Sequence, residues 1–359
     1  MKVELKKIRE IKFPSHCLSL ALDQDQRIYA SCLEGGVFIV GENNKNPEKI
    51  INHDNFSSGV SLCGDNIISS DYDGIVKWSR VSDYENIRQI KAHNFWSWQS
   101  AASPDNKKFG SVTGQYLVGG YKYEPAKEKE PSVRVYDTVS GEPIYSFEHT
   151  PPVQSITFSN DSRYLAAGNL MGEVRVWDLT NGEMVSKWRT DNFTGWGIIK
   201  GHYYTGGIFS IEFSPDDSSI YIAGMGSTRD PAAGNGKQLW EKYSWRPQEG
   251  APKLLSSALD SEIGQGLMEV IKFHPSKKFF LMAGRMFKGN WNTALFDANE
   301  GKIVCSQNSG MRCSDAVFNK DGTKLYIAGG KSQSKKIKEG SGSWGRVLEY
   351  EVLIKSDKS

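Results

Sequence analysis

The chain has 359 residues, of which 38% are hydrophobic and 24% charged, and 44 Lys and Arg against 42 Asp and Glu leave a net charge of +2. This composition excludes a disordered chain, collagen and a coiled coil, and it lacks the overall basic charge that nucleic-acid-binding domains usually carry. The 36 Gly and the 11% of aromatic residues favour many short strands joined by tight turns.

The first fifteen residues, MKVELKKIREIKFPS, are too highly charged to hold the apolar core of a signal peptide. No later run approaches the roughly 18 consecutive apolar residues that a membrane helix needs. We therefore expect a cytoplasmic protein without a membrane partner.

The five cysteines include no C-x-x-C pair, which argues against a zinc site and against a disulfide framework. If residues 23–26 form a hairpin turn, Cys17 and Cys32 lie opposite each other on two antiparallel strands. Two reduced thiols packed as small apolar side chains are the favoured interpretation, and a bond between them stays an open alternative.

Strand patterns recur along the chain. The clearest unit covers residues 153–188, where four short alternating segments are separated by polar and Gly-containing turns. The turn after the first strand of that unit recurs at Asp25, Asp65, Asp105, Asp161, Asp216, Ser276 and Asp321. Seven four-stranded units with a period of about 40 residues or more are typical of a β-propeller.

Short motifs point to one propeller family. The third strand of the clearest unit ends in Trp177-Asp178, softened versions stand at residues 136–137 and 296–297, and Ser-Pro-Asp turns occur at 103–105 and 214–216. The whole chain resembles a WD-repeat protein, which implies an all-β fold of seven four-stranded antiparallel blades. The divergence of several blades is more typical of bacterial WD-repeat proteins than of regular eukaryotic ones.

The resemblance also implies a buried hydrogen-bond network within a blade, formed by a His, a Ser or Thr, an Asp and the Trp of the third strand. In blade two the matching residues are His53, Ser69 or Ser70, Asp73 and Trp78. In blade four, where Trp177 and Asp178 end the third strand, Met171 stands at the place of the network Asp, so that network is expected to be incomplete.

The seventh unit stops after three strands, and residues 3–11 precede the first unit as a spare strand. We expect this N-terminal strand to complete blade seven, because pairing it there removes an exposed sheet edge. The prediction is one propeller over residues 1–355, followed by a polar tail at 356–359.

Four insertions separate the second strand from the third, at 115–131, 225–237, 285–292 and 331–344. The resemblance places these connections on the same face as the links between blades, and loops on a rigid scaffold commonly carry function. Aromatic residues gather there, either to pack the loops or to bind a partner. The predicted partner-binding residues are Trp96, Trp98, Trp196, His202, Tyr203, Arg285, Trp291 and Trp344.

The first hypothesis is therefore a non-catalytic platform that binds a protein or peptide through this loop face. Alanine at Trp98 or Trp291 should then weaken binding without unfolding the protein. The alternative is a small-molecule or glycan site at the mouth of the central channel, either a binding site or the site of an enzyme, which would use His202, Arg285, Glu269 and Asp315.

The sequence offers no catalytic or metal-binding motif. The six histidines form no H-x-x-x-H or HExxH arrangement, and the Gly-rich stretches lack the strand-to-helix setting of a phosphate-binding loop. We expect no cofactor and no metal, and we regard a nucleic-acid partner as the less favoured interpretation because no RNA-binding signature is present.

Overall fold

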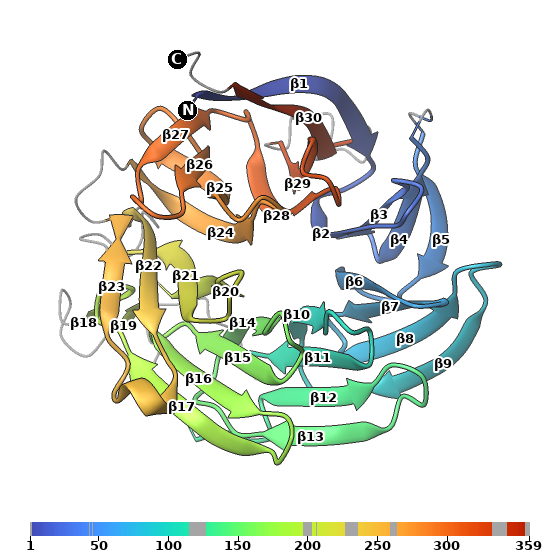
Figure 1. Cartoon of the computed structure of the whole chain (residues 1–359). Helices are drawn as coiled ribbons and strands as arrows, with labels where there is room; N and C mark the ends of the chain where they lie inside the picture. Colours follow the sequence, from blue (N-terminus) through green and yellow to red (C-terminus); the bar gives the residue numbers. More distant parts are fainter. Residues whose placement is uncertain are drawn as a thin grey trace.

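The computed structural model describes residues 2–42, 44, 46–114, 127–196, 203–205, 207–226, 236–258, 264–331 and 343–355. These residues form seven four-stranded antiparallel sheets arranged as the blades of a ring (Figure 1). The predicted seven-bladed propeller is confirmed.

The strands of the first four blades follow each other in chain order, from the channel outward. Blade one consists of β2 (Cys17–Leu22), β3 (Ile28–Cys32), β4 (Gly36–Val40) and β5 (Glu48–Asn52). Blade two consists of β6 (Ser57–Cys63), β7 (Asn66–Asp71), β8 (Ile75–Arg80) and β9 (Asn86–Lys91). Blade three consists of β10 (Ser97–Ala102), β11 (Lys108–Thr113), β12 (Val133–Asp137) and β13 (Pro143–Phe147). Blade four consists of β14 (Val153–Phe158), β15 (Tyr164–Asn169), β16 (Glu173–Asp178) and β17 (Glu183–Arg189).

A short hairpin of β18 (Thr194–Trp196) and β19 (Tyr203–Thr205) precedes blade five. Blade five consists of β20 (Ile208–Phe213), β21 (Ser219–Met225), β22 (Gln238–Ser244) and β23 (Leu254–Ser257), with a 3-10 turn, η2 (Pro247–Glu249), before its last strand. Blade six consists of β24 (Gln265–Phe273), β25 (Phe279–Lys288), β26 (Thr293–Asp297) and β27 (Ile303–Gln307). Blade seven consists of β28 (Arg312–Phe318), β29 (Lys324–Gly330), β30 (Gly345–Lys355) and β1 (Lys2–Phe13).

Blade seven is closed by the N-terminal strand, as the strand count predicted. Antiparallel β1 and β30 pair from Lys2 opposite Lys355 to Phe13 opposite Gly345, with a bulge between Lys7 and Arg9. Figure 1 shows the two strands side by side, with both ends of the chain at this blade. The closing strand is also packed into the core, because its inward side chains, Ile11 among them, are buried.

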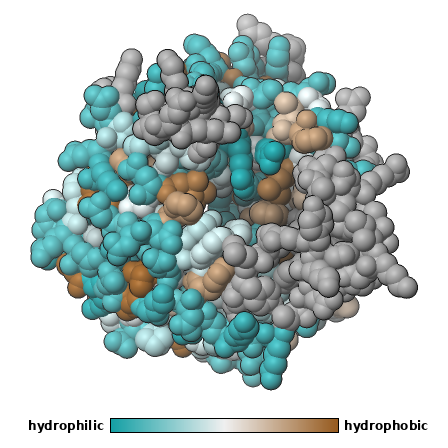
Figure 2. All heavy atoms as spheres, turned by 180° about the vertical axis from the view of Figure 1, so that it is seen from behind, coloured by the Kyte–Doolittle hydropathy of each residue, from teal (hydrophilic) through white to brown (hydrophobic). Residues whose placement is uncertain are grey.

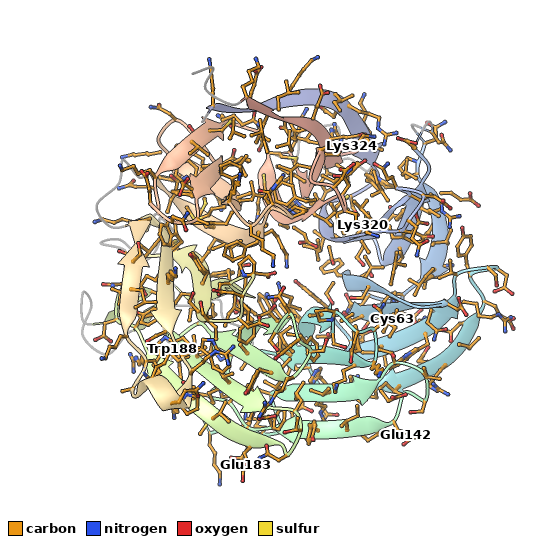
Figure 3. All side chains as sticks on the ribbon, viewed as in Figure 1. Cys63, Glu142, Glu183, Trp188, Lys320 and Lys324 are labelled. Carbon is orange, nitrogen blue, oxygen red and sulfur yellow. The ribbon has the colours of Figure 1, made fainter. Side chains whose placement is uncertain are left out.

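The outermost strand of each blade is the most exposed, and second strands such as β3 and β11 are more deeply buried than the channel-lining strands β2 and β10. Every residue of β14 is buried, whereas the outermost strand β9 is largely exposed. Glu142 and Glu183, at the outer strands of blades three and four, lie on the rim of the ring (Figure 3). The apolar residues therefore pack between neighbouring blades, and one large cluster joins blades four, five and six.

The recurring turn that revealed the blades has a common backbone geometry. In six blades the residue directly after the marker has a positive φ, between 55° and 75°, which bends the chain back into the second strand. These residues are Gln26, Asn106, Ser162, Asp217, Lys277 and Gly322.

Two predicted details are wrong in their placement. The acid of the blade-two network is Asp71 and not Asp73: the ring nitrogens of His53 lie 2.8 Å from Asp71 Oδ2 and 2.8 Å from Ser69 Oγ. Asp73 is exposed, because it lies in the turn beyond the strand, and it accepts a hydrogen bond from Asn55.

The same shift of two residues applies in blade four. Asn169 occupies the place of Asp71, since each side chain accepts hydrogen bonds from the backbone N–H groups two and four residues later. Met171 therefore does not stand at the network position. The indole N–H of Trp78 donates to the carbonyl of Thr138 in blade three, so it does not join the network around His53.

The predicted insertion 285–292 is in part a strand. β25 continues to Lys288, and its last residues pair with the beginning of β24, where Leu267 lies opposite Arg285. The other three insertions do separate strand two from strand three of their blades, and residues 115–126, 227–235 and 332–342 lie outside the described residues.

Cys17 and Cys32 lie opposite each other across β2 and β3, as predicted, and both are buried. Their sulfur atoms are 3.5 Å apart as free thiols. Among the described residues, no helix has the length and hydropathy to span a membrane.

Candidate functional site

The inner strands of all seven blades line a central channel with a volume of about 580 Å³. Each blade is a four-stranded antiparallel sheet, so every inner strand begins at the same end of the channel, which we name the channel mouth. Seen from behind, the ring is hollowed at its centre, with hydrophobic and hydrophilic side chains at the border (Figure 2).

A β-bulge interrupts every inner strand within its first five residues. The extra residue of each bulge has no partner on strand two, and all seven of these residues line the channel. We name them the bulge ring: Leu18, Ser58, Trp98, Gln154, Phe209, Glu269 and Ser314.

The residue after the bulge joins adjacent blades in several places. The carboxylate of Asp315 accepts a hydrogen bond from the backbone N–H of Leu20, and the amide oxygen of Gln99 accepts one from Ile156. Ser210 Oγ accepts a bond from the N–H of Ile271 in the same way. These contacts have a structural role, because they satisfy backbone groups that the bulge leaves outside the sheet ladder.

Five aromatic side chains form a continuous cluster beside the mouth. Tyr72 stacks on Trp96 with ring centroids 4.5 Å apart and lies 6.1 Å from Trp98. Phe95 also stacks on Trp96, with ring centroids 5.0 Å apart. Phe56 meets Tyr72 edge-on, with ring centroids 5.7 Å apart. We name Phe56, Tyr72, Phe95, Trp96 and Trp98 the aromatic cluster.

The aromatic cluster is partly accessible to solvent. Phe56 is 45% exposed, and the other four members are half-buried. Trp98 and Tyr72 also line the channel, so the cluster continues from the outer surface into the mouth.

An ion pair lies across the mouth from the cluster. Arg312 Nε is 2.7 Å from Glu269 Oε2, and a second guanidinium nitrogen contacts the other carboxylate oxygen. The charge of Glu269 raises the pKa of Arg312 further above its ordinary value. Burial raises the pKa of Tyr72 to about 12, and the Arg312 and Glu269 charges act on the same hydroxyl with opposite sign.

Charged groups also occur deeper in the channel. Lys272 Nζ lies 2.9 Å from Glu212 Oε2. Burial acts to lower the pKa of Lys272, but the nearby Glu212 and Asp315 carboxylates raise it above its ordinary value. Burial raises the pKa of Asp315.

The described histidines are structural. Burial lowers the pKa of His93 to about 3 and that of His149 to about 4, so both are neutral near pH 7. His93 bonds to Ser111 Oγ in its own blade, and His16 bonds to Ser314 Oγ at 2.7 Å. Histidine general acid–base chemistry has no support from these positions.

The structure brings together only part of the predicted partner-binding set. Trp96 and Trp98 lie 5.6 Å apart in the aromatic cluster. Trp344 is half-buried and lies against His16, with ring centroids 5.6 Å apart. Arg285 is exposed on β25 and does not belong to the residues that line the channel.

Trp291 belongs to the core. It is 5% exposed and meets Phe296 edge-on at 6.0 Å, because the extension of β25 folds the short connection back onto blade six. It therefore cannot contact a partner at the surface.

The remaining predicted residues lie in the link before blade five. Trp196 and Tyr203 pair with each other across β18 and β19, and His202 lies outside the described residues. Of the residues assigned to the alternative channel site, Glu269 and Asp315 do line the channel.

The sequence analysis missed Phe56, Tyr72, Phe95, Gln154 and Arg312. For Tyr72 a signal was present, since it lies in the turn between strands two and three of blade two. Turns of this kind belong to the loop face on which the partner-binding residues were predicted. Gln154 gave no signal, because only the bulge turns it toward the channel.

Among the described residues, no group of three His, Cys, Asp or Glu side chains could hold a metal ion. The mouth offers aromatic faces, an amide, a phenol and a neutralised ion pair. These groups suit recognition by stacking and hydrogen bonding.

Comparison with known proteins gives two matches. Residues 141–178 match the family model described as WD domain, G-beta repeat. This segment runs from the end of blade three through Trp177-Asp178 in β16. The chain is also 22% identical over 216 residues to the serine-threonine kinase receptor-associated protein of Gallus gallus, an alignment that covers 60% of this chain and 51% of that protein.

The chain thus spans about half the length of this curated relative. The matched repeat ends at the Trp-Asp pair of a blade whose four strands recur seven times around the channel. The chain is therefore a seven-bladed β-propeller in which one segment, residues 141–178, matches the WD-repeat family model.

Proposed function

We propose that the protein binds a segment of a partner protein through the aromatic cluster beside the channel mouth. A WD-repeat propeller is typical of protein-interaction scaffolds, and the relative in Gallus gallus is by its name a receptor-associated protein. The single observation that carries the proposal is the continuous cluster of five aromatic side chains in contact, which reaches the surface at Phe56.

The energetics of such a surface are favourable. Trp and Tyr dominate the binding energy of protein interfaces, because they bury a large area while few rotamers are lost. Here the sheets of blades two and three already hold the rings in contact, so binding costs little additional ordering. The partner would cover Phe56 and Trp96 and reach the mouth at Trp98.

The test begins with the identification of the partner. A photoreactive phenylalanine analogue at position 56 should crosslink to the partner in cells, whereas the same analogue at Leu255, an exposed residue of the outer strand β23, should not. The partner is then purified, and its affinity is measured for the wild type and for the double variant Phe56→Ala, Trp96→Ala.

We expect the double variant to weaken binding at least tenfold with an unchanged far-ultraviolet circular dichroism spectrum. The matched control is Leu254→Ala, Leu255→Ala, which removes an exposed apolar pair elsewhere on the ring and should leave the affinity unchanged. Equal affinity of the wild type and the aromatic variant would refute the proposal.

A further inference from the structure

The propeller fold does not require a particular type of side chain at the positions of the bulge ring. All seven positions are the extra residue of a bulge in an inner strand, yet they carry apolar, aromatic, hydroxyl, amide and carboxylate groups. Bonds between neighbouring inner strands are made by the following residues, such as Gln99 and Asp315. Ser58, Ser314 and Glu269 already have partners in Ser70, His16 and Arg312, whereas Gln154 keeps an amide oxygen that a ligand in the channel could use.

Gln154 is the strongest sign of such a ligand. Its side chain is only 2% exposed and lines the channel, and its Oε1 has no hydrogen-bond partner among the described residues. An unpaired buried acceptor destabilises the folded chain, because the hydrogen bonds that it made to water are not replaced. A group that donates an O–H or N–H into the channel at this point would remove that cost.

Aromatic walls flank this amide. Trp98 is the bulge residue of the preceding blade and Phe209 that of the following blade, and both line the channel. A ligand that reaches Gln154 therefore lies between two flat apolar surfaces. Such surfaces suit a ring with an apolar face.

The charges of the channel favour an uncharged ligand. Arg312 is paired with Glu269 through two contacts, and Lys272 is paired with Glu212. A cation would compete with Arg312 for the carboxylate, and an anion would compete with Glu269 for the guanidinium. A purely apolar ligand would leave the Gln154 oxygen unpaired.

Hydroxyl groups meet all of these demands, because each can donate one hydrogen bond and accept others. A hydroxyl can donate to Gln154 Oε1, and another can accept from the guanidinium of Arg312 or from the phenol of Tyr72, which also lines the channel. The channel volume of about 580 Å³ falls in the range of small-molecule sites, about 300–1,000 Å³.

We propose that the channel mouth binds a neutral sugar ring, with its C–H face on Trp98 and one hydroxyl bonded to Gln154. This site goes beyond the proposed protein interaction, because it uses the bulge ring and not the exposed edge of the aromatic cluster at Phe56. The sugar could be free or the end of a protein-linked glycan, which the experiment separates.

The experiment uses the full chain in two arms. Isothermal titration calorimetry measures binding of D-glucose, D-galactose, D-mannose and N-acetyl-D-glucosamine, each up to 20 mM, and a printed array tests the same sugars at the ends of oligosaccharides. The expected result is saturable binding in at least one arm. Binding in the first arm assigns a free sugar, and binding in the array alone assigns a glycan end.

Gln154→Met keeps the volume of the side chain and removes the amide, so it should weaken sugar binding at least tenfold. The control Gln89→Met changes an exposed glutamine on β9 and should bind as the wild type does. If Gln154→Met does not fold, Trp98→Leu serves as the second variant, with the same expected loss.

Two outcomes overturn the proposal. One is the absence of saturable binding in both arms. The other is binding that Gln154→Met and Trp98→Leu leave unchanged. The test is separable from that of the protein interaction, because the double variant Phe56→Ala, Trp96→Ala should keep sugar binding. If no sugar binds and a partner protein loses affinity for Gln154→Met, the sugar proposal is overturned. The channel mouth is then assigned to a side chain of the partner.

Discussion

Asp315 on β28 accepts a hydrogen bond of 2.7 Å from the backbone N–H of Leu20 on β2, and thereby joins the last blade to the first. The second carboxylate oxygen accepts a bond from the N–H of Ala316 at 2.8 Å. One side chain thus satisfies two backbone donors at the seam where the ring closes.

Replacing Asp315 by Leu should lower the free energy of unfolding by about 1–3 kcal/mol, because it leaves the N–H of Leu20 unpaired inside the ring. Asp315→Asn should cost less, since its amide oxygen can still accept. Urea unfolding followed by circular dichroism measures both, with Asp25→Ala, a highly exposed turn residue, as the control within about 0.5 kcal/mol of the wild type. Equal stability of Asp315→Leu and the control would show that the bond contributes nothing.

The acid beside His53 provides a second test. Asp71→Ala should cost about 3 kcal/mol, because the His53 ring and the N–H groups of Asp73 and Ile75 lose their acceptor in a buried position. Asp73→Ala should stay within about 0.5 kcal/mol of the wild type, as surface substitutions usually do. If urea unfolding showed a larger loss of stability for Asp73→Ala than for Asp71→Ala, Asp73 would be the network residue after all.

Trp291 and Trp96 should respond differently to truncation. Trp291→Ala leaves a cavity beside Phe296 and should lower the free energy of unfolding by about 3–5 kcal/mol. Trp96→Ala removes a half-buried ring and should cost clearly less. Differential scanning calorimetry compares the two, and a Trp291 variant as stable as the Trp96 variant would place Trp291 outside the core.

Deleting residues 2–12 should lower the melting temperature strongly. The deletion removes most of β1, exposes the edge of β30 and uncovers the core around Val3, Leu5 and Ile11. As a control, deleting residues 356–359 leaves the β1–β30 ladder intact and should change the melting temperature little. A shortened chain with the melting temperature of the full chain would mean that blade seven is stable with three strands.

Acid should destabilise the protein partly through Asp178. Arg163 donates two hydrogen bonds to its carboxylate and, with bonds from Thr180, lowers the pKa of Asp178 to about 2. A carboxyl with a lower pKa in the folded state stabilises fully above its unfolded value and loses this stabilisation as the pH falls toward 2. Because Arg163 is half exposed, screening limits the effect to about 1 kcal/mol.

The measurement is the urea midpoint at pH 7, 4 and 2.5 for the wild type and Asp178→Asn. The wild type should lose up to about 1 kcal/mol more than the variant between pH 7 and 2.5, with most of the difference below pH 4. Asp73→Asn, which changes an exposed carboxylate, is the matched control and should follow the wild type. Parallel curves for the wild type and Asp178→Asn would contradict the assigned pKa.

The architecture was predictable because its signals are local. Asp105, Asp161 and four of the other turn markers stand directly before a residue with positive φ, so a repeated backbone requirement produced a repeated sequence pattern. The closure of blade seven followed from counting strands, and the β1–β30 ladder confirms it. The facing thiols of Cys17 and Cys32 also follow from one hairpin turn.

The site was less predictable because its residues depend on tertiary geometry. Trp291 stood in a segment that alternation could not distinguish from a loop, and the pairing of Leu267 with Arg285 made it part of the core. Gln154 faces the channel only because a bulge inserts one residue before Ser155. A single inserted residue moves the side chains beside it to the other face of the strand. Because the composition of the strand stays the same, the alternation of polar and apolar residues does not reveal where the bulge lies.

The pairing of Lys2 with Lys355 places the first residue of β1 beside the last residue of β30, at one end of the closing ladder. A pulling force applied between these two residues acts first on the pair Lys2–Lys355 alone and then passes to the next pair of residues, Val3 and Ile354. The ladder would open like a zipper at low force, whereas force applied along the strands would load all of its hydrogen bonds together. Thermally the closing strand stabilises the ring, yet mechanically it is the place where the ring opens first.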